Sequence, residues 1–119
     1  MRKITTLLGS LALLAAVASG PALAQGFLGS YEDLPLAPGL AEVAGTGLSF
    51  DTPGGRIVEA YAKGNGTAAD ILKFYSTTLP QLGWTRESDT LYRREAEVLK
   101  LDTKAQGKGV VVHFTISPE

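Results

Sequence analysis

Residues that could carry out chemistry are sparse in this sequence. His113 is the single histidine of the 119 residues, and cysteine is absent. A histidine-assisted serine site needs a carboxylate to orient the imidazole and a hydroxyl beside it. Asp102 or Glu59 could supply the carboxylate across neighbouring strands, but no spacing in the sequence favours such a triad. One histidine without cysteine also falls short of a zinc ligand set. We therefore predict no catalytic residue and no metal site, and we expect His113 to be a solvated strand residue.

A glycine-rich stretch resembles a cofactor-binding loop. Residues 64–69, GNGTAA, match the G-x-G-x-x-A fingerprint of dinucleotide-binding folds, and Glu87 lies near the distance of the ribose-binding acid. Such a fold requires further parallel βαβ units, whereas only one helix is predicted in this chain. The strands after that helix are joined by tight turns. We interpret Gly64-Asn65-Gly66 as the turn between a strand and the helix, and we expect no cofactor.

The first 24 residues are organised as a cleavable signal peptide. Arg2 and Lys3 precede an uncharged run over residues 4–25, and Ala22-Leu23-Ala24 places small residues where signal peptidase reads them. The alternative is an uncleaved membrane anchor, because an apolar run of about 20 residues can span a bilayer. Glycine, serine and proline within the run disfavour the anchor. We predict cleavage after Ala24, a periplasmic location and no stable membrane insertion.

Charge excludes two classes of partner. Residues 25–119 carry nine basic and 12 acidic side chains, a net charge of −3. Such a chain attracts neither nucleic acid nor an anionic membrane surface. Arg93 and Arg94 could recognise a carboxylate or a phosphate. Alternation along a strand directs them to opposite faces, however, so they do not form a clamp.

The predicted mature chain divides into an N-terminal strap and one domain. Residues 25–45 are rich in glycine, proline and alanine, with isolated leucines and no helical or strand period. Such a segment is typical of an extended tether or a strap over a surface. Residues 46–119 are predicted to form a single α+β domain. It starts with a hairpin, because Leu48-Ser49-Phe50 alternates, the turn formers of residues 51–55 follow, and residues 56–63 resume a strand.

The helix of this domain has clear start and stop signals. Thr67 and Asp70 have the spacing of a capping box. An apolar stripe at helical spacing follows, formed by Ile71, Leu72, Tyr75, Leu79 and Leu82. In the stretch FYSTTLPQLGW, residues 74–84, Pro80 must loosen or end the helix. Gly83 provides a left-handed C-terminal cap. We expect Trp84 to close the end of the core between helix and sheet.

The remaining sequence predicts an antiparallel meander. Short strands are expected over residues 84–87, 90–94 and 97–103, and residues 110–117 alternate most clearly. With the hairpin, this makes a two-layer α+β sandwich of one amphipathic helix on a mainly antiparallel sheet of about six short strands. In the second hairpin strand, Val58, Ala60 and Ala62 share one face, and their small size suggests that the helix lies over it.

The sequence resembles a group of small exported proteins of Gram-negative bacteria. The similarity rests on four stretches, which are YEDLPLAPGL, SFDTPGGRIVEAYAKG, ILKFYSTTLPQLGW and the final strand VVVHFTISP. It covers residues 31–119, and its mark is the helix end F-Y-x-x-x-L-P-x-x-G-W. The resemblance supports the predicted fold and the exported location. It implies no activity, cofactor or catalytic residue.

Two binding hypotheses follow. If the helix covers one sheet face, the opposite face carries Ile57, Tyr61, Val111 and His113. A partly apolar face needs a cover, which the strap or a partner protein could supply. The leading hypothesis is therefore a non-catalytic periplasmic module that contacts another envelope protein through this face and the strap. The alternative is a small-ligand (amphiphile) carrier with a pocket between helix and sheet near Tyr75 and Trp84.

Overall fold

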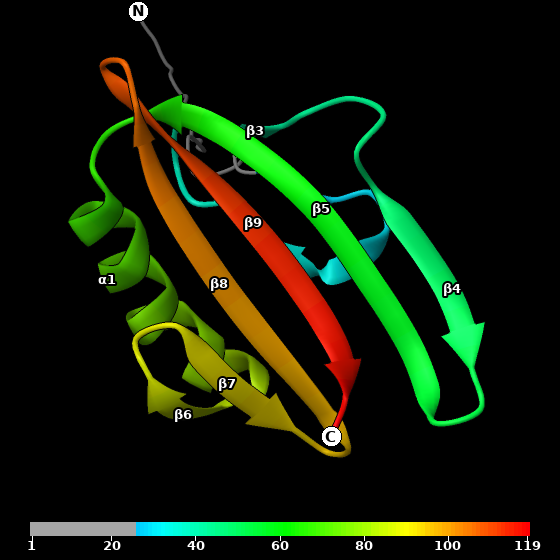
Figure 1. Cartoon of the computed structure of the whole chain (residues 1–119). Coiled ribbons are helices and arrows are strands. Elements are labelled where there is room, and N and C mark those ends of the chain that lie inside the picture. Colours follow the sequence, from blue (N-terminus) through cyan, green and yellow to red (C-terminus); the bar gives the residue numbers. More distant parts are fainter. Residues whose placement is uncertain (1–25) are drawn as a thin grey trace, which may run out of the picture.

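The computed structural model describes residues 26–119, which form one α-helix, a seven-stranded sheet and a two-stranded sheet (Figure 1). The predicted signal peptide, residues 1–24, lies outside the described residues. The small sheet contains β1 (Phe27–Leu28) and β2 (Tyr31–Pro35). The large sheet contains β3 (Leu40–Glu42), β4 (Leu48–Thr52), β5 (Gly55–Asn65), β6 (Thr85–Ser88), β7 (Leu91–Arg94), β8 (Glu97–Gln106) and β9 (Gly109–Pro118). The helix α1 (Ala68–Thr78) and the 3₁₀ helix η2 (Leu79–Leu82) connect β5 to β6. Within residues 26–119, no helix is long and apolar enough to span a membrane.

All neighbouring strands of the large sheet are antiparallel. The order is β3-β5-β9-β8-β7-β6, and β4 pairs with β5 on the side that β3 also uses. The α+β class with a mostly antiparallel sheet is confirmed. The predicted number of about six strands is too low, because the sheet has seven. The additional strand is β3, which lies in the segment predicted as a strap and is too short to show a period.

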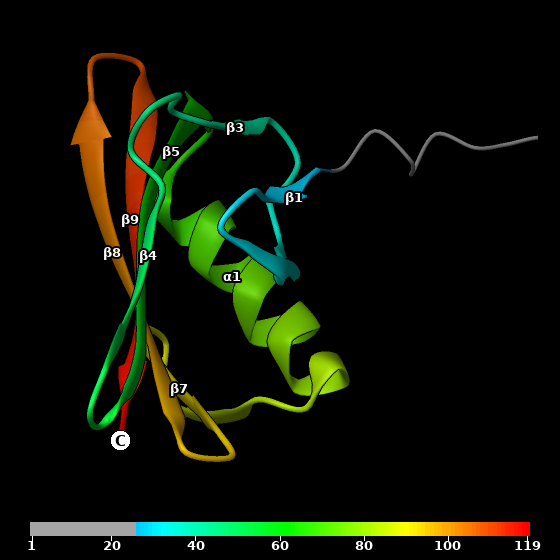
Figure 2. The same cartoon turned by 90° about the vertical axis from the view of Figure 1, so that its right-hand side faces the viewer.

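The helix lies over one face of the sheet (Figure 2). Val58, Ala60 and Ala62 of β5 are buried on this face, as the alternation predicted, and alternate residues of β8 and β9 continue the layer. The alanines leave room for large side chains above them. Tyr75 of α1 occupies this space and meets the Phe114 ring edge-on at a centroid distance of 5.7 Å.

The helix starts and ends where the sequence predicted. The Thr67 hydroxyl accepts a hydrogen bond from the Asp70 amide at 3.1 Å, which caps the first turn. At the other end, α1 gives way to η2 at Leu79, directly before Pro80. Gly83 adopts a left-handed φ of 93°, and the Trp84 amide donates to the Leu79 carbonyl at 3.1 Å. Trp84 is thereby turned into the core, where 2% of its surface is exposed.

The N-terminal segment differs from the expected strap. It folds into β1, β2 and β3, and six of its side chains belong to the core, namely Leu28, Tyr31, Leu34, Leu36, Ala37 and Leu40. It lies on the same face of the sheet as α1, so the suggestion that it covers the opposite face is wrong (Figure 2). The reason is geometric. A helix is about 10 Å across, whereas six strands side by side span roughly 24 Å, so one helix leaves apolar sheet surface that this segment fills.

Candidate binding surfaces

The sheet face opposite α1, which we call the open face, collects exposed apolar side chains. Ile57, Tyr61, Val111 and His113 all lie on it, as predicted, because they alternate with buried residues along β5 and β9. Tyr61 is directly opposite His113 in the sheet, and 39% of the Tyr61 surface is exposed. The open face therefore presents a partly apolar surface that no segment of residues 26–119 covers.

Two further apolar residues of the open face were missed from the sequence. Phe50 of β4 is opposite Ile57, and Leu48 is opposite Glu59, so both share the open face. Their exposed fractions are 49% and 55%. The alternation of Leu48-Ser49-Phe50 signalled a strand with one apolar side. It did not tell which side of the sheet that would be.

A stacked aromatic pair lies on the open face. The rings of Tyr61 and His113 are stacked, with centroids 4.2 Å apart and planes inclined by 2°. Nε2 of His113 lies 2.9 Å from a carboxylate oxygen of Glu59, and this contact orients the imidazole ring. Glu59 was one of the two neighbours considered for a triad. No serine or threonine hydroxyl of the described chain bonds to His113, so the arrangement offers a flat platform and no activated nucleophile.

Tyr75 and Trp84 are core residues. The Tyr75 hydroxyl donates to the Pro35 carbonyl at 2.7 Å and accepts from the Ala37 amide at 3.2 Å, which ties α1 to the N-terminal segment. Burial of this side chain raises the pKa of the Tyr75 hydroxyl. The Trp84 ring is covered by the guanidinium of Arg94, whose Cζ lies 4.5 Å from a ring centroid. Both side chains therefore belong to the hydrophobic core.

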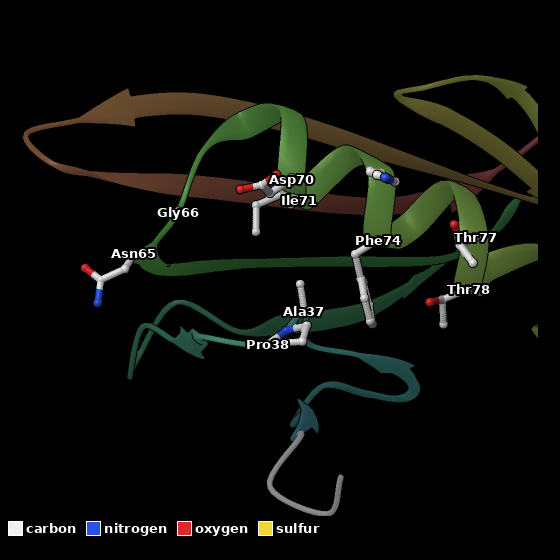
Figure 3. Close-up of a pocket in the computed structure, with 10 residues that line it drawn as sticks. Ala37, Pro38, Asn65, Gly66, Asp70, Ile71, Phe74, Thr77 and Thr78 are labelled. Atoms are coloured by element: carbon white, nitrogen blue, oxygen red, sulfur yellow. The ribbon is translucent and has the colours of Figure 1, made fainter. Parts of the chain in front are cut away.

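An apolar groove lies elsewhere, between α1 and the N-terminal segment. Its volume is about 450 Å³. Figure 3 shows Ile71 and Phe74 directed from the helix toward Ala37 and Pro38 on the opposite wall. Polar residues line the rest of the groove, and these are Asn65, Asp70, Lys73, Thr77 and Thr78 together with Gly66. Phe74 lies beside the apolar stripe of α1, and this position was the signal for the groove in the sequence. The opposite wall depends on where the N-terminal segment lies.

A polar network holds the N-terminal segment at Tyr31, the first residue of β2. The Arg94 guanidinium donates to the Tyr31 hydroxyl at 2.6 Å and to the Leu82 carbonyl at 3.0 Å. The Tyr31 hydroxyl in turn donates to Glu97 at 3.1 Å. Arg93 makes separate ion pairs with Glu87 and Glu119, so the two arginines do not act together. Because Arg94 is engaged by β2 and η2, we assign it a structural role.

Within residues 26–119, no group of three or more acidic or histidine side chains could hold a metal ion. Comparison of the chain with protein-family models, with curated proteins and with solved structures gives no match.

Proposed function

We propose that this chain is a non-catalytic periplasmic binding module that contacts another envelope protein through the open face. The observation that carries the proposal is the clustering of Leu48, Phe50, Ile57 and Tyr61 on one uncovered sheet face. Exposed apolar residues gathered in this way are typical of protein interaction sites. Aromatic side chains are the most frequent anchors of such sites, and stacking on His113 holds Tyr61 in one orientation before a partner binds.

The proposed location rests on the signal peptide predicted for residues 1–24. The N-terminal segment contributes to the module in a different way from the one first expected. It completes the core on the helix side of the sheet and therefore does not cover the open face (Figure 2). Lys100 and Asp102 of β8, which lie beside the apolar residues on the open face, would form part of the rim of an interface.

The proposal is tested by crosslinking the tagged, exported protein in intact cells and identifying captured proteins by mass spectrometry. We expect one dominant envelope partner, whose recovery falls at least about tenfold in Tyr61→Asp and in Ile57→Asp, since a charge in an apolar interface costs more than 1.4 kcal/mol. Gln81→Asp is the matched control, because it adds the same charge at an exposed site on η2. Equal recovery of the partner by all three variants, with unchanged melting temperatures, would rule out the open face.

The second candidate function is a carrier of a small amphiphile, which would bind in the groove between α1 and the N-terminal segment. The specific observation is an apolar groove of about 450 Å³ with Lys73 among its lining residues. An acyl chain could lie against Phe74 and Pro38, and the ammonium group could meet an anionic head group.

Fluorescence titration with dansyl-aminoundecanoate tests the carrier function. If the groove binds acyl chains, Thr77→Trp should block it and weaken binding by about tenfold or more, since fewer methylenes would be buried. Gln81→Trp adds the same bulk outside the groove and should bind like the unmodified protein. Failure of the unmodified, folded protein to bind the probe would remove this candidate and leave the proposed interaction module untouched.

A further inference from the structure

The two edges of the large sheet are built differently. The edge strand β6 is protected against pairing with other chains, because it is four residues long, carries Arg86 and Glu87, and has a register shift between Arg86 and Ser88. Short strands, charges and bulges are the common means of blocking an edge. The other edge is shared by β3 and β4. Of these, β4 is five residues long, pairs with β5 in unbroken register, and contains one charged residue, Asp51, and no proline. It exposes Leu48 and Phe50 instead.

The backbone of β4 has polar groups available for another strand. On β5, the Tyr61 carbonyl accepts from the Val43 amide at 2.7 Å, so Tyr61 directs its backbone groups toward the β3 and β4 side. Backbone N–H and C=O groups of every second residue in a strand point to the same side, so those of Ile57 and Glu59 also point toward β4. Their partners Phe50 and Leu48 therefore face β5, and the backbone groups of Ser49 and Asp51 point outward. Among the described strands, β5 is the single partner of β4, and no ribbon lies beyond β4 in Figure 1.

We propose that β4 pairs with β4 of a second copy of this chain, antiparallel, about a two-fold axis through Phe50. This register pairs all five residues of the strand, since Leu48 then meets Thr52 and Ser49 meets Asp51 of the second copy. The outward backbone groups of Ser49 and Asp51 become the hydrogen-bonding pair. Phe50 meets its own copy in the close, non-hydrogen-bonded position, where aromatic pairs stabilise sheets.

The positions of Asp51 and Pro53 favour this register over the one with its axis at Asp51. An axis through Asp51 would place two carboxylates opposite each other and would set Ser49 against Pro53, which has no N–H to donate. With the axis through Phe50, Asp51 faces an uncharged serine. A two-fold axis perpendicular to the sheet also keeps both open faces on one side. The dimer would therefore join them into one continuous surface, with the two Phe50 rings between the two Ile57 side chains.

Introduced cysteines test the register. Because the chain has no cysteine, any disulfide must join two introduced thiols. Phe50→Cys should form a covalent dimer under mild oxidation at least about tenfold faster than Lys100→Cys, an exposed position within the sheet. A mixture of Leu48→Cys and Thr52→Cys should yield the mixed dimer in preference to either homodimer. Equal rates for Phe50→Cys and Lys100→Cys would overturn the proposal.

Sedimentation equilibrium tests the association without a crosslink. The unmodified protein should show a concentration-dependent dimer. Ser49→Pro, which removes an outward N–H that β5 does not use, should shift it to monomer while the melting temperature at low concentration is unchanged. Tyr61→Asp lies outside the β4 pairing and should still dimerise even where it loses a captured partner, so the two proposals can fail separately. A monomer at all concentrations would overturn the proposal, because β4 would then pair with a different protein or with no other strand.

Discussion

Replacing Gly64 with alanine should destabilise the protein by about 3 kcal/mol, the upper range for forcing extra atoms into a packed site. A Cβ at this position would lie 2.0 Å from the Gly39 carbonyl oxygen and 3.1 Å from Cα of Leu40. Both contacts are with backbone, which cannot rotate away. The pairing of β3 with β5 would have to open, and with it the anchoring of the N-terminal segment. For a domain of this size, the melting temperature should fall by about 10 °C or more.

The measurement is thermal unfolding followed by circular dichroism, with Gly54→Ala as the matched control. Gly54 lies in the turn between β4 and β5, and its nearest neighbours would be 4.0 Å from an added Cβ. We expect the control to unfold within about 0.5 kcal/mol of the unmodified protein. If Gly64→Ala were as stable as Gly54→Ala, the close approach of β3 to β5 would be wrong.

Removing the hydroxyl oxygen of Tyr75 should cause the second-largest loss of folding stability. In Tyr75→Phe, the Pro35 carbonyl and the Ala37 amide lose their shared partner in the core. A buried polar group left without a hydrogen bond costs about 1–3 kcal/mol. Urea unfolding measures this loss, and Tyr61→Phe is the control because Tyr61 is 39% exposed, so that water can reach its side chain. A loss equal to that of the control would mean that Tyr75 does not join the helix to the N-terminal segment.

The same side chain predicts a dependence of stability on alkaline pH. Burial raises the pKa of Tyr75 above its ordinary value of 10.0. Above pH 10, the unfolded chain releases the phenol proton while the folded chain keeps it, so the free energy of unfolding falls as pH rises. Burial also raises the pKa of Tyr31 and Tyr92, which adds to the fall. Urea unfolding of Tyr75→Phe should therefore show a shallower decline in this range than the unmodified protein, and an identical decline would contradict the assignment.

Local signals in the sequence predict this structure most accurately. The helix boundaries follow from Thr67, Pro80 and Gly83, because a cap, a missing N–H and a left-handed turn each act within one turn of the chain. The buried face of β5 follows from alternation with period two. These patterns predicted the α+β class and the face beneath the helix.

The candidate sites were predicted only in part. The open-face residues were identified because they alternate with buried ones along the same strands. The groove beside Phe74 was not predicted, because its second wall comes from Ala37 and Pro38. These residues precede Phe74 by 37 and 36 positions, so no periodic pattern in the sequence connects the two walls. Gly64 was interpreted as a turn residue, although it lies inside β5 and its glycine is required by contact with Gly39.

The sequence alone determined the helix and the strands of residues 46–119, the alternation of apolar and polar side chains along them, and the way the helix ends. Each of these depends on hydrogen bonds and side chains a few residues apart. The tertiary structure decided which side of the sheet each segment occupies. The isolated leucines of the N-terminal segment show no period, yet they are buried because one helix is too narrow to cover the sheet. Leu48 and Phe50 are apolar, yet they are exposed because pairing with β5 turns them to the face that no described segment covers.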